Sequence, residues 1–235
     1  QTSSDVPTPD GGALCSADGW CWQNPLPQGN ALKALWGKGK ELVAVGVGGT
    51  VLHFDGSRWK RATTPSNEEL NAVWGGSHLI AVGNGGVILR QQGGQWQKDQ
   101  SGTTQHLHGV WTHDGGAYAV GRNGTVLSFD GSRWSGVTTP AKTDLYGVWG
   151  QSKDDVYVAG KEVLLHFDGK AWKKESVGAA AFPGTLQAVW GGETEVWAAG
   201  WDRRKSIVFR KKDGKWAEAH AGKNDYTSYY ALSGS

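Results

Sequence analysis

The stretch Thr50–Trp59 reads TVLHFDGSRW, and the stretch Thr125–Trp134 reads TVLSFDGSRW. The two stretches differ at one of ten positions although their starts lie 75 residues apart. Close self-similarity within one chain is the signature of a repeat architecture, in which every repeat forms one supersecondary unit. Further copies of the same unit are therefore expected in the residues around both stretches.

A six-residue phrase that begins with leucine precedes each stretch and recurs three more times. Its five copies read LKALWG from Leu32, LNAVWG from Leu70, LHGVWT from Leu107, LYGVWG from Leu145 and LQAVWG from Leu186. Neighbouring copies start 37 to 41 residues apart, and each is followed by a second phrase such as LVAVG at 42–46. The chain therefore consists of a unit of about 40 residues that is present five times.

Each unit is predicted to contain four short strands. The phrases alternate, are rich in Val, Leu and Trp, and are separated by glycine-containing turns. The Asp-Gly pairs at Asp55 and Asp130 favour tight hairpins because glycine tolerates a positive φ. Units of four strands at this period predict an all-β fold, a single β-propeller with one blade per unit.

Both ends of the chain carry partial copies of the unit. Within residues 13–27, Asp18-Gly19 aligns with Asp55-Gly56 and Trp22 aligns with Trp59 of the segment 51–65. Residues 229–234 align with the leucine phrase. We predict six blades, five continuous and one closed by residues 11–30 together with 226–235, because pairing strands from both termini removes open sheet edges. The propeller would span 11–235, after a flexible segment at 1–10. This closing blade has no evident second strand, so either it has three strands or the chain is a fragment of a longer array. Five blades with loose ends are the alternative.

The repeated pattern, together with the segment DGWCWQNPLPQGN at 18–30, resembles the Trp-rich propeller repeats of secreted bacterial proteins of the myxobacterial type. The resemblance covers nearly all of the chain from Gly12 onward. It implies a propeller fold and export, and it implies little about function because one fold serves many functions.

Tryptophan occupies two fixed positions of the unit. The inner set is Trp36, Trp74, Trp111, Trp149 and Trp190, and the outer set is Trp22, Trp59, Trp96, Trp134, Trp172 and Trp216. A large flat side chain at a fixed position is expected to fill the space between neighbouring blades. The alternative is that some indoles are exposed and stack on a sugar.

The candidate ligand-binding residues are those that vary where the repeat is otherwise constant. The second residue of the leucine phrase should line one mouth of the central channel, where a polar ligand could be bound by hydrogen bonds. The turns between second and third strands should lie on the same face, and Trp201 and Arg203 are placed in an insertion there. The set is Lys33, Asn71, His108, Tyr146, Gln187, Tyr230, Asn84, Arg122, Trp201 and Arg203.

Composition excludes several function classes. The 24 basic and 22 acidic residues give a net charge of +2 without a charged block, so nucleic acid is not expected as a partner. No apolar run is long enough to cross a membrane, and membrane insertion is not expected.

Common catalytic motifs are absent from the sequence. We expect no enzyme activity, with a hydrolase or lyase at the channel mouth as the residual alternative. We also expect no cofactor and no metal site, because His106 and His108 lack a third ligand.

The chain contains no Met and begins at Gln1, which indicates a processed N-terminus such as a removed secretory signal. Cys15 and Cys21 flank a turn at Asp18-Gly19, and in an exported protein we expect them to form a disulfide. The sequence thus predicts a secreted or cell-surface binding protein without catalytic activity, lectin-like, with a glycan or similar polar ligand. A protein–protein scaffold is the alternative, since the loops differ strongly from one unit to the next. The oligomeric state is not predicted.

Overall fold

A computed structural model of the chain describes residues 29–177, 182–202 and 205–222. Within them each repeat unit forms one four-stranded antiparallel sheet, and the strands of every sheet follow one another in chain order. The first two sheets are β1 (Leu32–Lys38), β2 (Glu41–Gly46), β3 (Val51–Phe54) and β4 (Trp59–Arg61), then β5 (Leu70–Gly75), β6 (Leu79–Gly83), β7 (Ile88–Gln92) and β8 (Gln95–Asp99).

The third sheet is β9 (Leu107–His113), β10 (Gly116–Gly121), β11 (Val126–Phe129) and β12 (Trp134–Gly136). The fourth is β13 (Leu145–Ser152), β14 (Asp155–Gly160), β15 (Val163–Phe167) and β16 (Trp172–Lys174). The fifth is β17 (Thr185–Gly191), β18 (Glu195–Asp202), β19 (Lys205–Lys212) and β20 (Lys215–Ala221). Short 3-10 turns, η1 (Val47–Gly49), η2 (Asn84–Gly86) and η3 (Arg122–Gly124), join second to third strands in the first three sheets.

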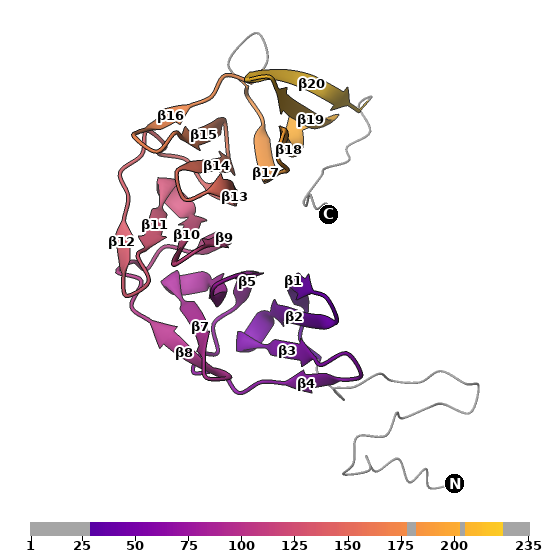
Figure 1. The fold of residues 1–235 in the computed structure, drawn as a ribbon, viewed down its shortest axis with the longest axis vertical. Coiled ribbons are helices and arrows are strands. Elements are labelled where there is room, and N and C mark those ends of the chain that lie inside the picture. The colour runs from indigo at the N-terminus through magenta and orange to yellow at the C-terminus, as the bar shows by residue number, and fades with distance from the viewer. Residues whose placement is uncertain (1–28, 178–181, 203–204, 223–235) are drawn as a thin grey trace, which may run out of the picture.

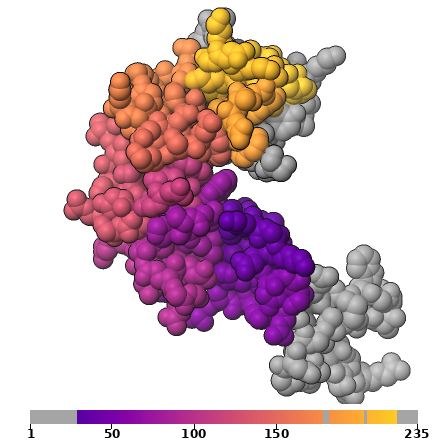
Figure 2. All heavy atoms as spheres, in the orientation of Figure 1, coloured from indigo at the N-terminus to yellow at the C-terminus, as the bar shows by residue number. Residues whose placement is uncertain are grey.

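The five sheets stand side by side in an arc. Strands β1, β5, β9, β13 and β17 lie innermost, and β4, β8, β12, β16 and β20 lie at the outer rim (Figure 1). The described residues leave the ring open between the first and the fifth sheet (Figure 2). The predicted closing segments are 11–30 and 226–235, and apart from residues 29 and 30 they lie outside the described residues, as do Cys15 and Cys21. No helix in the described ranges is long and apolar enough to cross a membrane.

The Asp-Gly turns between third and fourth strands form as the sequence predicts. The Asp55 Oδ1 atom accepts hydrogen bonds from the backbone N–H groups of Ser57 and Arg58, each at 3.0 Å. Asp130 makes the same two bonds at 2.9 Å in the third sheet. These backbone bonds, from Arg133 and Ser132, lower the pKa of Asp130 to about 2. The carboxylate therefore closes the turn as a charged acceptor.

The inner tryptophans set the spacing between neighbouring sheets. The indole of Trp36 lies against Gly75, that of Trp111 against Gly150, and that of Trp149 against Gly191. A Cβ atom on Gly150 would lie 2.6 Å from the Trp111 ring, closer than real carbon atoms approach. In the second, fourth and fifth units, the glycine that follows the inner tryptophan therefore leaves room for the tryptophan of the preceding sheet. The third unit departs from this pattern, since Thr112 follows Trp111.

The outer tryptophans also pack between sheets, in the opposite direction. Trp96 Nε1 donates a hydrogen bond of 3.1 Å to His53 Nε2 of the first sheet. Trp134 Nε1 donates one of 3.1 Å to Asp99 Oδ2 of the second sheet. Between the third and fourth sheets Trp172 contacts Tyr118 edge-on, and between the fourth and fifth sheets Trp216 contacts Tyr157 edge-on. The predicted packing role is thus confirmed for these four tryptophans, whereas Trp59 contacts Phe54 of its own sheet and Trp22 lies outside the described residues.

We expect Gly150→Ala to destabilise the fold by about 1–3 kcal/mol, because the new methyl group overlaps the Trp111 ring. Urea denaturation of the variant and of the parent protein measures the difference. Gly192→Ala is the matched control, since a Cβ atom there meets nothing within 4 Å and its stability should not fall. Equal midpoints for Gly150→Ala and the parent would contradict the tryptophan–glycine contact.

Candidate functional site: the channel mouth

Five of the varied residues meet at one place. The second residue of each leucine phrase lies on an innermost strand, and together these residues line a cavity of about 390 Å³. The five lining residues are Lys33, Asn71, His108, Tyr146 and Gln187. Each comes from a different sheet, so the cavity is the mouth of the space that the arc surrounds. We refer to it below as the channel mouth.

A β-bulge presents each of these side chains. In the first sheet Leu32 pairs with Gly46 and Ala34 pairs with Val45, so Lys33 has no partner on β2. The pairing shifts in the same way around Asn71, His108, Tyr146 and Gln187. A bulge adds one unpaired residue to a strand and redirects its side chain. The innermost strands can therefore keep their core contacts while this one residue faces the channel mouth.

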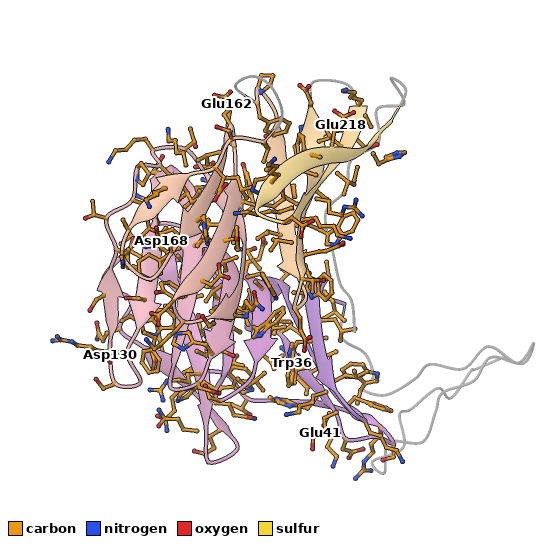
Figure 3. The ribbon with its side chains drawn as sticks, turned by 45° about the horizontal axis from the view of Figure 1, so that its top comes forward. Trp36, Glu41, Asp130, Glu162, Asp168 and Glu218 are labelled. Atoms are coloured by element: carbon orange, nitrogen blue, oxygen red, sulfur yellow. The ribbon has the colours of Figure 1, made fainter. Side chains whose placement is uncertain are left out.

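The turns and the long connections lie at the same end of the sheets. The backbone N–H of Asn84 in η2 donates to the carbonyl of Glu69 at 2.9 Å, and that of Arg122 in η3 donates to His106 at 2.9 Å. Figure 3 shows Glu162, in the turn after β14, at one end of the sheets and Asp130 at the other. The shared face that the sequence predicts for turns and connections is therefore present.

One mouth residue, Asn71, also joins two sheets. Its amide Nδ2 donates to Asn84 Oδ1 at 3.0 Å and to the carbonyl of Leu107 at 2.8 Å. The first bond holds the η2 turn against β5, and the second ties the second sheet to the third. Part of the hydrogen-bonding capacity of Asn71 is thus used within the scaffold.

Aromatic rings form another side of the mouth. The rings of His108 and Tyr146 stack with centroids 5.5 Å apart and an angle of 29° between their planes. Burial lowers the pKa of His108, and the nearby Arg122 guanidinium lowers it further. Burial also raises the pKa of Tyr146, with Asp144 acting in the same direction. At neutral pH both rings are therefore uncharged hydrogen-bonding groups.

Further polar groups stand around these neutral rings. Lys33 forms an ion pair with Glu69. Asp144 Oδ1 accepts a hydrogen bond of 2.9 Å from the backbone N–H of Asn123, and His106 Nδ1 accepts one of 2.9 Å from Gly85. None of Glu69, His106 and Asp144 was predicted from the sequence to support the mouth. Glu69, His106 and Asp144 all directly precede the leucine of a repeat, and this shared position could have identified them.

Trp201 does not lie in a loop, and that prediction is wrong. It belongs to β18, where it pairs with Thr185 of β17 and Ser206 of β19. The hairpin of β18 and β19 continues to the pair Asp202–Lys205, so the residues read as an insertion lengthen the strands. Trp201 is half-buried and is not among the residues that line the channel mouth. Arg203 and Tyr230 lie outside the described residues.

Two larger cavities lie beneath the connections between sheets. One, of about 710 Å³, is lined mainly by residues 98–104 together with Gly85 and Gly86. The other, of about 500 Å³, is lined by residues 62–65 and 94–96. The first draws on the second unit and the connection after it, and the other draws on the first two units. The channel mouth instead receives one side chain from every described sheet. Within the described ranges, no three His, Cys, Asp or Glu side chains gather closely enough to hold a metal ion.

We expect Asn71→Ala to lower stability by about 1–3 kcal/mol, because it leaves Asn84 Oδ1 and the Leu107 carbonyl without their donor. Thermal or urea unfolding measures the loss. Gln187→Ala is the control, since Gln187 lines the same mouth but makes no side-chain hydrogen bond to another described residue. If the two variants were equally stable, Asn71 would not join the sheets.

No family model matches the chain, and no curated protein matches it. Solved structures do. The structure of YCF48 bound to a D1 peptide is 14% identical, covers 85% of this chain and 68% of that chain, and has a TM-score of 0.60. YCF48 from Cyanidioschyzon merolae is 14% identical, with coverage of 84% and 87% and a TM-score of 0.55. The computationally designed Ika8 protein is 13% identical, with coverage of 93% and 70% and a TM-score of 0.71. With the five radial sheets, these similarities show that the chain has a β-propeller fold.

Proposed function

We propose that this protein is a non-catalytic binding propeller that takes an extended peptide segment of a partner protein at the channel mouth. The observation that carries the proposal is the set of five bulged residues, all different, at one cavity. They offer an ammonium group, two amides, an imidazole and a phenol. A peptide presents backbone donors and acceptors together with varied side chains, and such an asymmetric ligand suits an asymmetric set of partners.

The glycan alternative has less support from the same residues. A lectin built from repeats is expected to offer similar pockets in successive units, with exposed aromatic rings for sugar stacking. Here Trp96, Trp111, Trp134 and Trp149 are each at most 8% exposed and pack between sheets. The solved propeller of similar fold that holds a D1 peptide adds an analogy in favour of a protein partner. Secretion or display at the cell surface remains a prediction from the sequence.

Six blades are part of the proposal, because the first sheet exposes apolar side chains whose equivalents in the other four sheets are buried. Leu32 and Leu35 of β1 are 46% and 62% exposed. The leucines that match Leu32, namely Leu70, Leu107, Leu145 and Leu186, are 0% exposed, and the valines that match Leu35, namely Val73, Val110, Val148 and Val189, are 4–7% exposed. In those units the preceding sheet covers the side chains. A sixth sheet from 11–30 and 226–235 would cover Leu32 and Leu35.

The fifth sheet offers matching positions at the other side of the opening. The Arg210 guanidinium lies 5.5 Å from the Trp197 ring centre. These two residues are equivalent to His166 and Tyr157 of the fourth sheet. There, Tyr157 contacts Trp216, the outer tryptophan of the next unit. By the repeat alignment Trp22 would meet Arg210 and Trp197. Tyr230 would then be the sixth residue of the channel mouth.

Stability measurements test this closure. Leu35→Asn should cost about 2–4 kcal/mol in the intact chain, because a covered leucine loses its apolar contacts and buries an amide. In a chain that lacks 226–235 the same substitution should change stability by less than about 0.5 kcal/mol, as expected at an exposed site. A neutral effect in both chains would favour the five-blade alternative.

Binding of peptides tests the proposed function. A peptide array and a glycan array are screened with the intact protein, and hits are titrated by fluorescence anisotropy. We expect peptide hits whose affinity falls about tenfold or more in His108→Ala and in Gln187→Ala, a loss typical of residues central to an interface. Arg133→Ala, whose side chain is exposed beside Asp130 at the opposite end of the sheets, is the control and should bind normally.

The other outcomes of this screen are equally definite. Glycan hits without peptide hits would establish the lectin-like alternative. Peptide binding that His108→Ala and Gln187→Ala leave unchanged would place the site away from the channel mouth.

A further inference from the structure

His53 and His166 occupy the same repeat position but have opposite surroundings. Both stand two residues before the aspartate of the Asp-Gly turn, in the phrase HFDG, on β3 and β15. His53 bonds to Trp96 of the next sheet, whereas the two carboxylates bonded to His166 belong to its own sheet. The second and third units carry Arg90 and Ser128 there instead of histidine.

The contact at His53 requires a neutral imidazole. His53 Nε2 accepts the hydrogen bond of 3.1 Å from Trp96 Nε1, and an imidazolium nitrogen has no lone pair with which to accept. Burial lowers the pKa of His53, while the charge of Glu41 on β2 opposes this shift. Lys60, opposite His53 on β4, is paired with Asp55 at 2.8 Å.

The contact at His166 is built for a protonated imidazole. His166 Nε2 lies 2.7 Å from Asp155 Oδ1, and His166 Nδ1 lies 3.0 Å from Glu175 Oε1. Only the imidazolium form can donate to both carboxylates at once. Lys173, opposite His166 on β16, is paired with Asp168 at 2.5 Å.

The fifth sheet is tied into this group through one lysine. Lys211 Nζ of β19 lies 3.1 Å from Glu175 Oε1 and 3.2 Å from the hydroxyl of Tyr157. The Tyr157 ring in turn stacks on His166 with centroids 4.2 Å apart. Asp155, Glu175, Tyr157 and Lys211 are thus the ionisable groups that face His166 from β14, from the end of β16 and from β19.

The balance of these groups favours the charged form of His166. Burial opposes the charge, but the hydrogen bonds to Glu175 and Asp155 outweigh burial and the repulsion from Lys211, so the pKa of His166 is raised. The hydrogen bond from His166 lowers the pKa of Glu175 to about 2, so this carboxylate stays ionised in mild acid.

We propose that these two histidines make two contacts of the propeller respond to pH in opposite directions. Acidification weakens the contact between the first and second sheets at His53, and a rise in pH weakens the contacts that hold Asp155 and Glu175 of the fourth sheet against His166. Lys33 and Asn71 of the channel mouth belong to the first and second sheets, and Tyr146 belongs to the fourth, so either change acts on a sheet that lines the mouth. The inference does not depend on which ligand the mouth takes.

The signs follow from proton linkage. His53 has a folded pKa below 6.5, so its contribution to stability is present above pH 6.5 and is lost as the pH falls toward the lowered pKa. His166 has a folded pKa above 6.5, so its contribution is present below pH 6.5 and is lost as the pH rises through the raised pKa. Both contacts are therefore close to full strength only near pH 6.5. For every unit by which the folded pKa is shifted, the equilibrium constant for local opening of the contact rises about tenfold when the contribution is lost.

The ring signals of the two histidines give the first test. NMR titration of the wild-type protein, with signals assigned through His53→Gln and His166→Gln, should give a pKa below 6.5 for His53 and above 6.5 for His166. Two values on the same side of 6.5 would overturn the proposal. The wild-type titration decides the point with any other assignment method if a variant does not fold.

Hydrogen exchange at several pH values gives the second test, with protection factors corrected for the intrinsic rate. Protection of β8 should fall on acidification, protection of β16 and of the Glu175 amide should fall as the pH rises, and protection at the contact of β11 with β12 serves as the reference. In His166→Gln, β16 should stay at the alkaline wild-type level throughout, while the acid response of β8 persists. Unchanged pH-dependent protection of β16 in His166→Gln would overturn the assignment to His166.

Discussion

The contact between an inner tryptophan and the glycine of the following sheet determines the geometry of this protein. Because Gly75, Gly150 and Gly191 have no side chain, the indoles of Trp36, Trp111 and Trp149 lie directly against their backbones. Neighbouring innermost strands are thereby held at a fixed close distance. That distance sets how the sheets radiate and how wide the space between the innermost strands can be. The outer tryptophans fill the wider part of the same gaps.

The channel mouth depends on a separation of roles along each innermost strand. Residues such as Leu70 and Val73 are buried in the core, and the intervening bulged residue Asn71 is released from pairing with β6. Its side chain can change without disturbing the tryptophan–glycine contact. The same division lets His108 and Tyr146 differ from Lys33 although the scaffold around them is the same. A repeated fold thus carries a site with no repeated chemistry.

Much of this architecture could be predicted from the sequence. The spacing of the leucine phrases predicts the sheets, Asp55 and Asp130 predict the turns, and the two tryptophan positions predict the packing. The gathering of Lys33, Asn71, His108, Tyr146 and Gln187 could be predicted because equivalent positions on radial strands converge. The bulges could not, since pairing across a strand has no sequence signal at this position. The insertion GWDRRKS predicts a loop at Trp201, whereas backbone pairing extends the strands through Asp202 and Lys205.

The account rests on the claim that the channel mouth holds a peptide. A crystal structure of the intact protein with a peptide selected by binding tests this most directly. The account predicts that the peptide lies across the mouth, with hydrogen bonds to side chains such as His108 and Gln187 from different sheets. A peptide seated instead on the rim, along β20 or in the cavities beneath the connections, would contradict it.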